Sequence, residues 1–128
     1  MRLMLDTHAF IWWASNSIKL PPAVMAEMSD PANTLLLSVI SVWEMQIKVQ
    51  LGKLKVNRPL PDLVEHHTRV NRMQILPVGL EHVLALDALP AHHKDPFDRL
   101  LIAQASVEDV FLVSGDPVFS SYPIKLLW

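Results

Sequence analysis

The chain carries four separated carboxylates whose settings could form a reactive centre: Asp6, Glu44, Asp98 and Asp116. Two of them follow apolar runs, which predict buried strands. Asp6 comes directly after residues 3–5, and Asp116 comes shortly after residues 110–113. Both are therefore expected where a strand ends, although a helix cap would also explain Asp6 and a turn would also explain Asp116.

Glu44 lies in a predicted helix, residues 39–51, on one stripe with Ile40, Ile47 and Leu51. This spacing predicts that the stripe faces the core. A carboxylate on an apolar helix face costs on the order of several kcal/mol unless it is paired or bound to a cation. A site is favoured here, while a surface salt bridge to Lys48, four residues on, is the alternative.

Asp98 follows Asp95-Pro96-Phe97 at the predicted start of a helix. If Asp95 caps that helix and Pro96 is its first residue, Asp98 lies in the first turn, where a carboxylate gains from the free backbone N–H groups. This local arrangement explains both acids without catalysis. We assign Asp95 to capping and keep Asp98 as the candidate that faces the other three carboxylates.

Together the four acids indicate a metal centre. Clustered carboxylates repel one another and need protons or a cation. Oxygen ligands in a chain without Cys favour Mg²⁺ or Mn²⁺. One such ion, or two about 4 Å apart, can activate water and stabilise the leaving oxygen in phosphodiester cleavage.

A parallel sheet could position these acids. The sequence predicts strands at 2–5, 34–37, 74–78 and 110–114, separated by helices at 9–14, 22–28, 39–51, 60–71, 80–89 and 95–107, with Gly52 closing the third helix. Strands separated by helices of this length indicate a three-layer α/β domain, in which ligands bind beyond the carboxyl ends of the strands. The 128 residues are the size of a single domain.

The composition fits a cytoplasmic protein without a membrane segment. No apolar run approaches the roughly 20 residues of a membrane span or the core of a signal peptide, and cysteine is absent. The net charge is −2, but residues 45–72 hold two acidic residues against six basic ones: Lys48, Lys53, Lys55, Arg58, Arg69 and Arg72. This stretch could steer a polyanion, or it could simply be a solvated surface.

The sequence resembles the PIN-domain ribonucleases, in particular the toxins of bacterial VapBC toxin–antitoxin pairs. The matching stretches span nearly the whole chain in the family's order: Leu5-Asp6-Thr7-His8, residues 38–44 (SVISVWE), residues 93–105 (HKDPFDRLLIAQA) and Val113-Ser114-Gly115-Asp116. A single Asp-Thr pair has no value as a signal, whereas the ordered set, above all the stretch around Asp98, is fairly specific.

The resemblance implies a Rossmann-like PIN domain that cleaves RNA endonucleolytically with Mg²⁺ or Mn²⁺. Asp6, Asp98 and Asp116 would bind the metal directly or through water, and Glu44 would help to hold metal or water. The resemblance further implies a homodimer and a cognate VapB-like antitoxin that covers the active-site groove. Residues with possible accessory roles are Thr7 and Ser114 as supporting ligands, Arg99, Lys48 and Lys53 as substrate contacts, and Trp12 and Trp13 as antitoxin contacts.

Three other readings compete with this one. The pairs His66-His67 and His92-His93 suggest zinc, but neighbouring residues on a helix point about 100° apart and rarely bind one metal. A phosphatase of the haloacid dehalogenase type would need a second Asp where His8 stands. The third is a catalytically silent binding module that acts through a protein partner.

Overall fold

The computed structural model describes residues 1–128 and has a five-stranded parallel sheet at its centre. The strands are β1 (Arg2–Leu5), β2 (Thr34–Ser38), β3 (Gln74–Leu76), β4 (Phe111–Val113) and β5 (Lys125–Leu127). They lie in the order β3-β2-β1-β4-β5, and every neighbouring pair is parallel. The carboxyl end of β1 therefore lies between those of β2 and β4.

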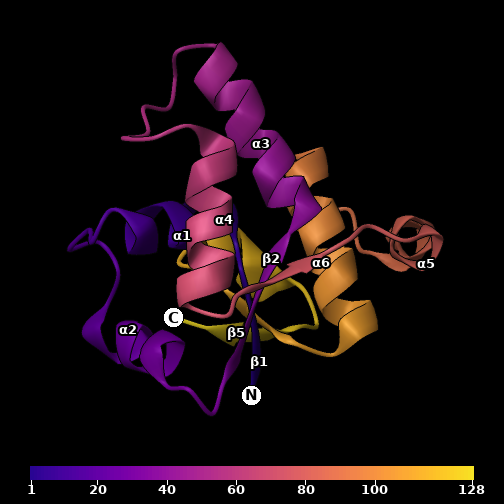
Figure 1. Ribbon diagram of the computed structural model, residues 1–128. Coiled ribbons are helices and arrows are strands. Elements are labelled where there is room, and N and C mark those ends of the chain that lie inside the picture. The colour runs from indigo at the N-terminus through magenta and orange to yellow at the C-terminus, as the bar shows by residue number, and fades with distance from the viewer.

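Helices cover both faces of this sheet. They are α1 (Thr7–Ala14), α2 (Pro22–Ser29), α3 (Val39–Gln50), α4 (Leu60–Val70), α5 (Leu80–Leu84) and α6 (Pro96–Glu108). In Figure 1, α1, α2 and α4 lie on one side of the sheet, and α5 and α6 lie on the other. The predicted three-layer α/β/α fold with a parallel sheet is confirmed. No helix is both long and apolar enough to cross a membrane.

Each face of the sheet has its own buried core, because successive side chains of a strand point to opposite faces. Leu3 of β1 packs with Phe10 of α1 and Val24 of α2. Met4, the next residue along β1, packs with Leu101 of α6 on the other face. Burial on both faces explains why β1 and β2 are continuous apolar runs.

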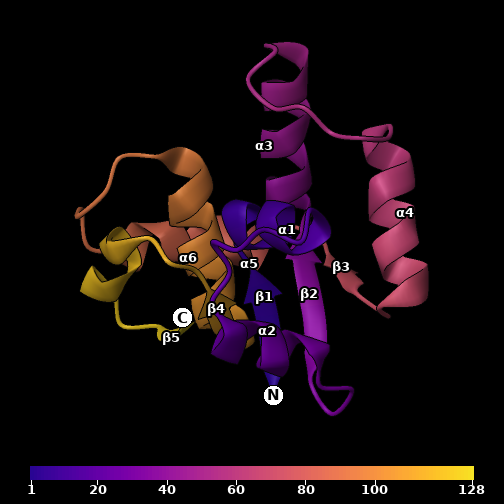
Figure 2. The ribbon, with the colours of Figure 1, turned by 90° about the vertical axis from the view of Figure 1, so that its left-hand side faces the viewer.

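The prediction for α3 was wrong in its second half. Leu51 was expected to face the core, yet 62% of its surface is exposed. The buried residues of this helix are Ile40, Ser41 and Met45. Figure 2 shows the reason: α3 begins against the sheet but then extends beyond the end of β2, with α4 returning beside it.

The C-terminal half also departs from the prediction. The strand expected at 74–78 ends at Leu76, since Pro77 has no N–H to give to the ladder. The helix expected at 80–89 is divided into α5 and a 3₁₀ turn, Ala85–Ala88. Strand β5 was not predicted, and it pairs with β4 at the edge of the sheet.

Candidate active site at the carboxyl edge of the sheet

The strand register brings the starting points of the candidate site to one level. Leu5 pairs with Leu37 of β2 and with Val113 of β4. The residues that follow these three, Asp6, Ser38 and Ser114, therefore lie side by side at the carboxyl edge. The Asp6 N–H extends the ladder by donating to the Val113 carbonyl over 3.0 Å.

Asp6 caps α1 and is buried in this edge. Its Oδ1 accepts a hydrogen bond from the Ala9 N–H at 2.7 Å, and only 6% of the residue is exposed. Burial raises the pKa of the Asp6 carboxyl above its ordinary value, and the negative charge of Asp116 raises it further. Hydrogen bonds from Ser114 and Ala9 act in the opposite direction without cancelling the effect of burial. Asp6 is thus both a helix cap and a member of a carboxylate cluster.

Glu44 is tied to the start of α1. The Thr7 hydroxyl donates to Glu44 Oε1 at 2.5 Å, so this bond joins α1 to α3. Lys48 Nζ lies 3.1 Å from Glu44 Oε2, which is the salt bridge considered from the sequence. The Glu44 side chain nevertheless remains only 13% exposed. Its charge is therefore held at the edge of the core by one hydroxyl and one ammonium group.

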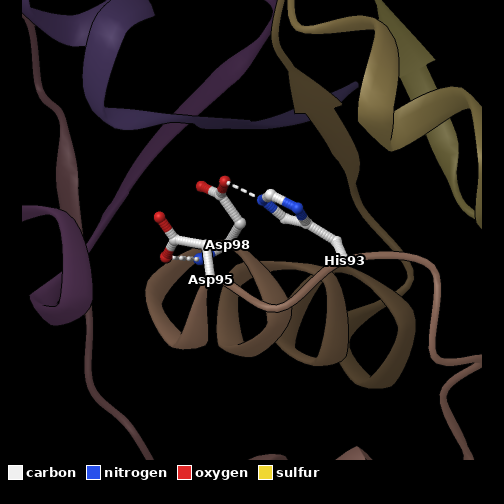
Figure 3. Close-up of side chains that lie close together, drawn as sticks. All are labelled: His93, Asp95 and Asp98. Atoms are coloured by element: carbon white, nitrogen blue, oxygen red, sulfur yellow. Dashed lines mark hydrogen bonds and ion pairs between the residues drawn. The ribbon is translucent and has the colours of Figure 1, made fainter.

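Asp98 and Asp95 have separate tasks at the start of α6. Asp95 Oδ1 accepts from the N–H groups of Phe97 at 2.8 Å and Asp98 at 3.2 Å, so Asp95 is the helix cap. Asp98 instead contacts His93, whose Nε2 lies 2.8 Å from Asp98 Oδ2 (Figure 3). Burial raises the pKa of Asp98, the charges of Asp95 and Glu44 add to this, and His93 opposes it. Asp98 therefore lies close enough to Glu44 for their negative charges to repel each other.

Asp116 lies in the exposed loop after β4. Its N–H donates to Ser114 Oγ at 3.1 Å, and its Oδ1 accepts from the Val118 N–H at 3.0 Å. The second bond caps the 3₁₀ turn Pro117–Ser121, so the turn role considered from the sequence is present. The Trp128 side chain closes over this loop, because a Cβ on Gly115 would lie 2.4 Å from the indole. The buried Ser114 links the Asp116 backbone to Asp6.

The four acids therefore approach one another as two linked pairs. Asp6 feels the charge of Asp116, and Asp98 feels that of Glu44. The Thr7–Glu44 hydrogen bond connects the pairs, because Thr7 directly follows Asp6. The raised carboxyl pKa values of Asp6 and Asp98, together with the hard oxygen donors of all four acids, fit a divalent cation. His93, Asp95 and Asp98 also offer ligand atoms that lie within 4.8 Å of one another.

Two of the basic residues considered as substrate contacts lie in other settings. The Arg99 guanidinium donates to the carbonyls of Pro90, His93 and Leu86 at 3.0, 3.4 and 3.5 Å. It therefore holds the connection before α6, which leaves little of its donor capacity for a phosphate. Lys53 is exposed beyond the end of α3, which points away from the sheet (Figure 2). Only Lys48 reaches one of the four acids.

Three residues that organise the site had no predicted role in it. His93 pairs with Asp98, and it was considered only as half of a possible zinc pair. Ser38 and Gln104 form a buried hydrogen bond, and Gln104 Nε2 also donates to the Pro77 carbonyl at 3.3 Å. These bonds join the end of β2, α6 and the residue after β3. The only signal in the sequence was Gln104, a polar residue among the apolar positions of α6.

The neighbouring histidines do not act as paired metal ligands. The rings of His66 and His67 pack edge-on against each other, with their centroids 5.1 Å apart. His92 packs against Tyr122, whereas His93 contacts Asp98. His67 is buried and its ring packs edge-on against Phe10, and burial lowers its pKa. The zinc reading therefore has no support in this arrangement.

The two tryptophans of α1 are partly buried and pack within the protein. Trp12 lies 5.7 Å from the ring of Trp128, and Trp13 lies 5.1 Å from that of His67. Both tryptophans therefore contribute to the packing of this chain.

A fold with acids at this edge is the arrangement of a known class of proteins. The family model for the PIN domain matches residues 3–125. The chain therefore belongs to the PIN-domain family, whose members are generally nucleases that act on nucleic acid, and this excludes the dehalogenase-type phosphatase. No curated protein gives a significant sequence match.

Solved structures agree over the whole chain. VapBC2 from Rickettsia felis, bound to a DNA fragment from its promoter, aligns with a TM-score of 0.74 and 20% identity, covering 99% of this chain and 98% of that one. FitAcB from Neisseria gonorrhoeae gives 0.65 and 16%, with 98% and 96% covered. VapBC-1 from nontypeable Haemophilus influenzae gives 0.63 and 17%, with 99% and 97% covered. At these identities the likeness shows the fold.

Proposed function

We propose that this PIN domain is an endoribonuclease dependent on Mg²⁺ or Mn²⁺, and that it acts as a VapC-like toxin. One observation carries the proposal: carboxylates from four separate segments lie along the carboxyl edge of the sheet as two interacting pairs, Asp6 with Asp116 and Asp98 with Glu44, and one member of each pair has a raised pKa. Membership of the PIN family supports a nuclease. Carboxylate burial of this kind destabilises a metal-free protein, so it needs a functional reason.

The chain's own residues divide the work. Asp6, Asp98 and Asp116 would hold the ion directly or through water, and Glu44 would help to hold metal or water. Thr7 fixes Glu44 through its hydroxyl, and Ser114 fixes Asp6. When bound, Mg²⁺ or Mn²⁺ supplies the Lewis acidity for hydrolysis of an RNA phosphodiester.

Substrate and protein partners follow from charge and from the structural relatives. The basic residues of the 45–72 stretch, including Lys48 and Lys53, attract the RNA backbone towards the acidic centre. Another similar structure, VapBC-5 from Mycobacterium tuberculosis, is described as a member of the VapBC family of toxin–antitoxin systems. We propose a VapB-like antitoxin and a homodimer for this chain as well. Light scattering of the purified protein, alone and with a candidate antitoxin, tests both assemblies.

A catalytically silent binding module is the second candidate. One observation favours it: each acid already has a partner within the chain. Glu44 is paired with Lys48 and Asp98 with His93, while Asp6 and Asp116 accept backbone N–H groups. Such a site could be stable without a cation, and the chain could then act only through a protein partner.

Two variants three residues apart in the sequence separate these functions. Asp98→Asn removes a proposed ligand, whereas Asp95→Asn removes a nearby charge but keeps an oxygen that can cap α6. RNA cleavage by purified protein in Mn²⁺ is measured for both and for the wild type. We expect at least a hundredfold loss for Asp98→Asn and a change of only a few-fold for Asp95→Asn. Equal losses would overturn the assignment of Asp98, and an inactive wild type would favour the silent module.

A further inference from the structure

Trp43 is a large exposed aromatic residue beside the proposed site. It directly precedes Glu44 in α3, and 57% of its surface is open. Its ring meets Phe97 edge-on, with the centroids 5.0 Å apart and the planes at 69°. Phe97 in turn directly precedes Asp98 in α6. An aromatic pair and an acid pair thus lie one residue apart on the same two helices.

This position is unusual in its chemistry as well as its exposure. Single exposed apolar side chains are common and need no explanation. Here, however, the exposed indole borders a cluster of carboxylates, where phosphate groups are repelled unless a cation is present. An aromatic face attracts a nucleobase without any charge of its own. The indole can therefore add affinity for RNA beside the carboxylates, where the charge of the chain does not attract RNA.

We propose that Trp43, packed edge-on against Phe97, stacks an unpaired base of the RNA whose phosphate would lie at the cation beside Glu44 and Asp98. This inference rests on the proposed ribonuclease function. The edge-on contact fixes one side of the indole and leaves its remaining surface open, so that the platform is oriented before the substrate arrives. Because every base has a π-face, the subsite selects single-stranded RNA and tolerates different sequences.

The test measures base stacking apart from phosphate contacts. A fluorescein-labelled single-stranded oligoadenylate and an abasic oligomer of the same length are titrated with protein in Ca²⁺, a hard cation of looser geometry chosen to limit cleavage. Stacking of one base contributes roughly a 5- to 150-fold difference in affinity. We expect the wild type to prefer the oligoadenylate by such a factor, and Trp43→Ala to lose that preference while its affinity for the abasic oligomer stays the same.

Three further variants make the result specific. Trp43→Phe keeps a ring and should retain most of the preference, whereas Trp43→Leu keeps apolar bulk without a ring and should behave like Trp43→Ala. Ile18→Ala removes another exposed apolar side chain, 99% open in the connection between α1 and α2, and should change nothing. Because Trp43 is exposed, all of these variants should keep the melting temperature of the wild type.

The outcomes distinguish this inference from the function on which it rests. If the wild type cleaves RNA and prefers the base-bearing oligomer, but Trp43→Ala keeps that preference, the stacking subsite is overturned. The exposed indole would then belong to a contact with a protein partner. If the wild type neither binds nor cleaves RNA with any divalent cation, the proposed function itself fails, and the subsite fails with it.

Discussion

Replacing Asp6 by Asn should make the metal-free protein more stable and the metal-loaded protein less stable. Asn has the same shape, and its side-chain oxygen can still accept the Ala9 N–H that caps α1. The substitution therefore removes charge while keeping the local hydrogen bond. The charge is costly without a cation because Asp6 is buried and faces the negative charge of Asp116.

The sign of the pH dependence follows from the raised pKa of Asp6. Below the ordinary aspartate pKa both states hold the proton, and Asp6 costs nothing. As the pH rises from that value to the higher folded pKa, the unfolded chain ionises first, so the free energy of unfolding falls. The loss is complete above the folded pKa. In EDTA at neutral pH, Asp6→Asn should thus have a higher free energy of unfolding, and a higher melting temperature, than the wild type.

Bound metal should reverse the order of stability of the wild type and Asp6→Asn. A ligand at a hundred times its dissociation constant stabilises the folded state by about 2.7 kcal/mol. The wild type should gain about that amount in Mn²⁺, whereas Asp6→Asn should gain little. Melting curves of both proteins in EDTA and across a Mn²⁺ titration therefore should cross. If the wild type is the more stable protein in EDTA, the burial argument is refuted, and equal gains in Mn²⁺ would remove Asp6 from the metal site.

Three other perturbations test the supporting residues. His93→Ala should weaken Mn²⁺ binding about 10- to 100-fold by calorimetry, since the group that orients Asp98 is lost, and an unchanged affinity would contradict that role. Gln104→Leu leaves the Ser38 hydroxyl without its acceptor and should cost about 1–3 kcal/mol in urea unfolding. Asp95→Ala should cost about 0.5–2 kcal/mol in the same assay, and loss of stability in Asp95→Asn as well would contradict a capping role.

The sequence predicts the parts of the fold that depend on local signals or on the burial of both faces of a strand. Strands β1, β2 and β4 are buried on both faces, so each appears as an apolar run that needs no partner to be recognised. The start of α6 is equally local, because Asp95 and Pro96 specify it within two residues. Asp6 and Asp116 could be placed at one edge for the same reason, once a parallel sheet was inferred.

The parts that escaped prediction depend on contacts distant in sequence. Strand β5 has three residues, only partly buried, and owes its conformation to pairing with β4. Leu51 follows an apolar period, yet α3 has by then left the sheet that would cover it. Arg99 is of a residue type that suits phosphate binding. Only the path of residues 86–93 shows that its guanidinium donates to backbone carbonyls instead. No periodicity carries that information.

Capping and metal binding are compatible roles for the aspartates at this edge. In a parallel α/β fold, a helix begins where its strand ends, so free backbone N–H groups and candidate ligands share one place. The hydrogen bonds inside the chain take Oδ2 of Asp98 and Oδ1 of Asp116, which leaves the second oxygen of each carboxylate. These bonds fix the carboxylates in position, and the bond from His93 favours the ionised form of Asp98 against burial. A cap is thus a reason to expect an ordered ligand here, and the charge-removing Asn substitutions are the changes that separate the two roles.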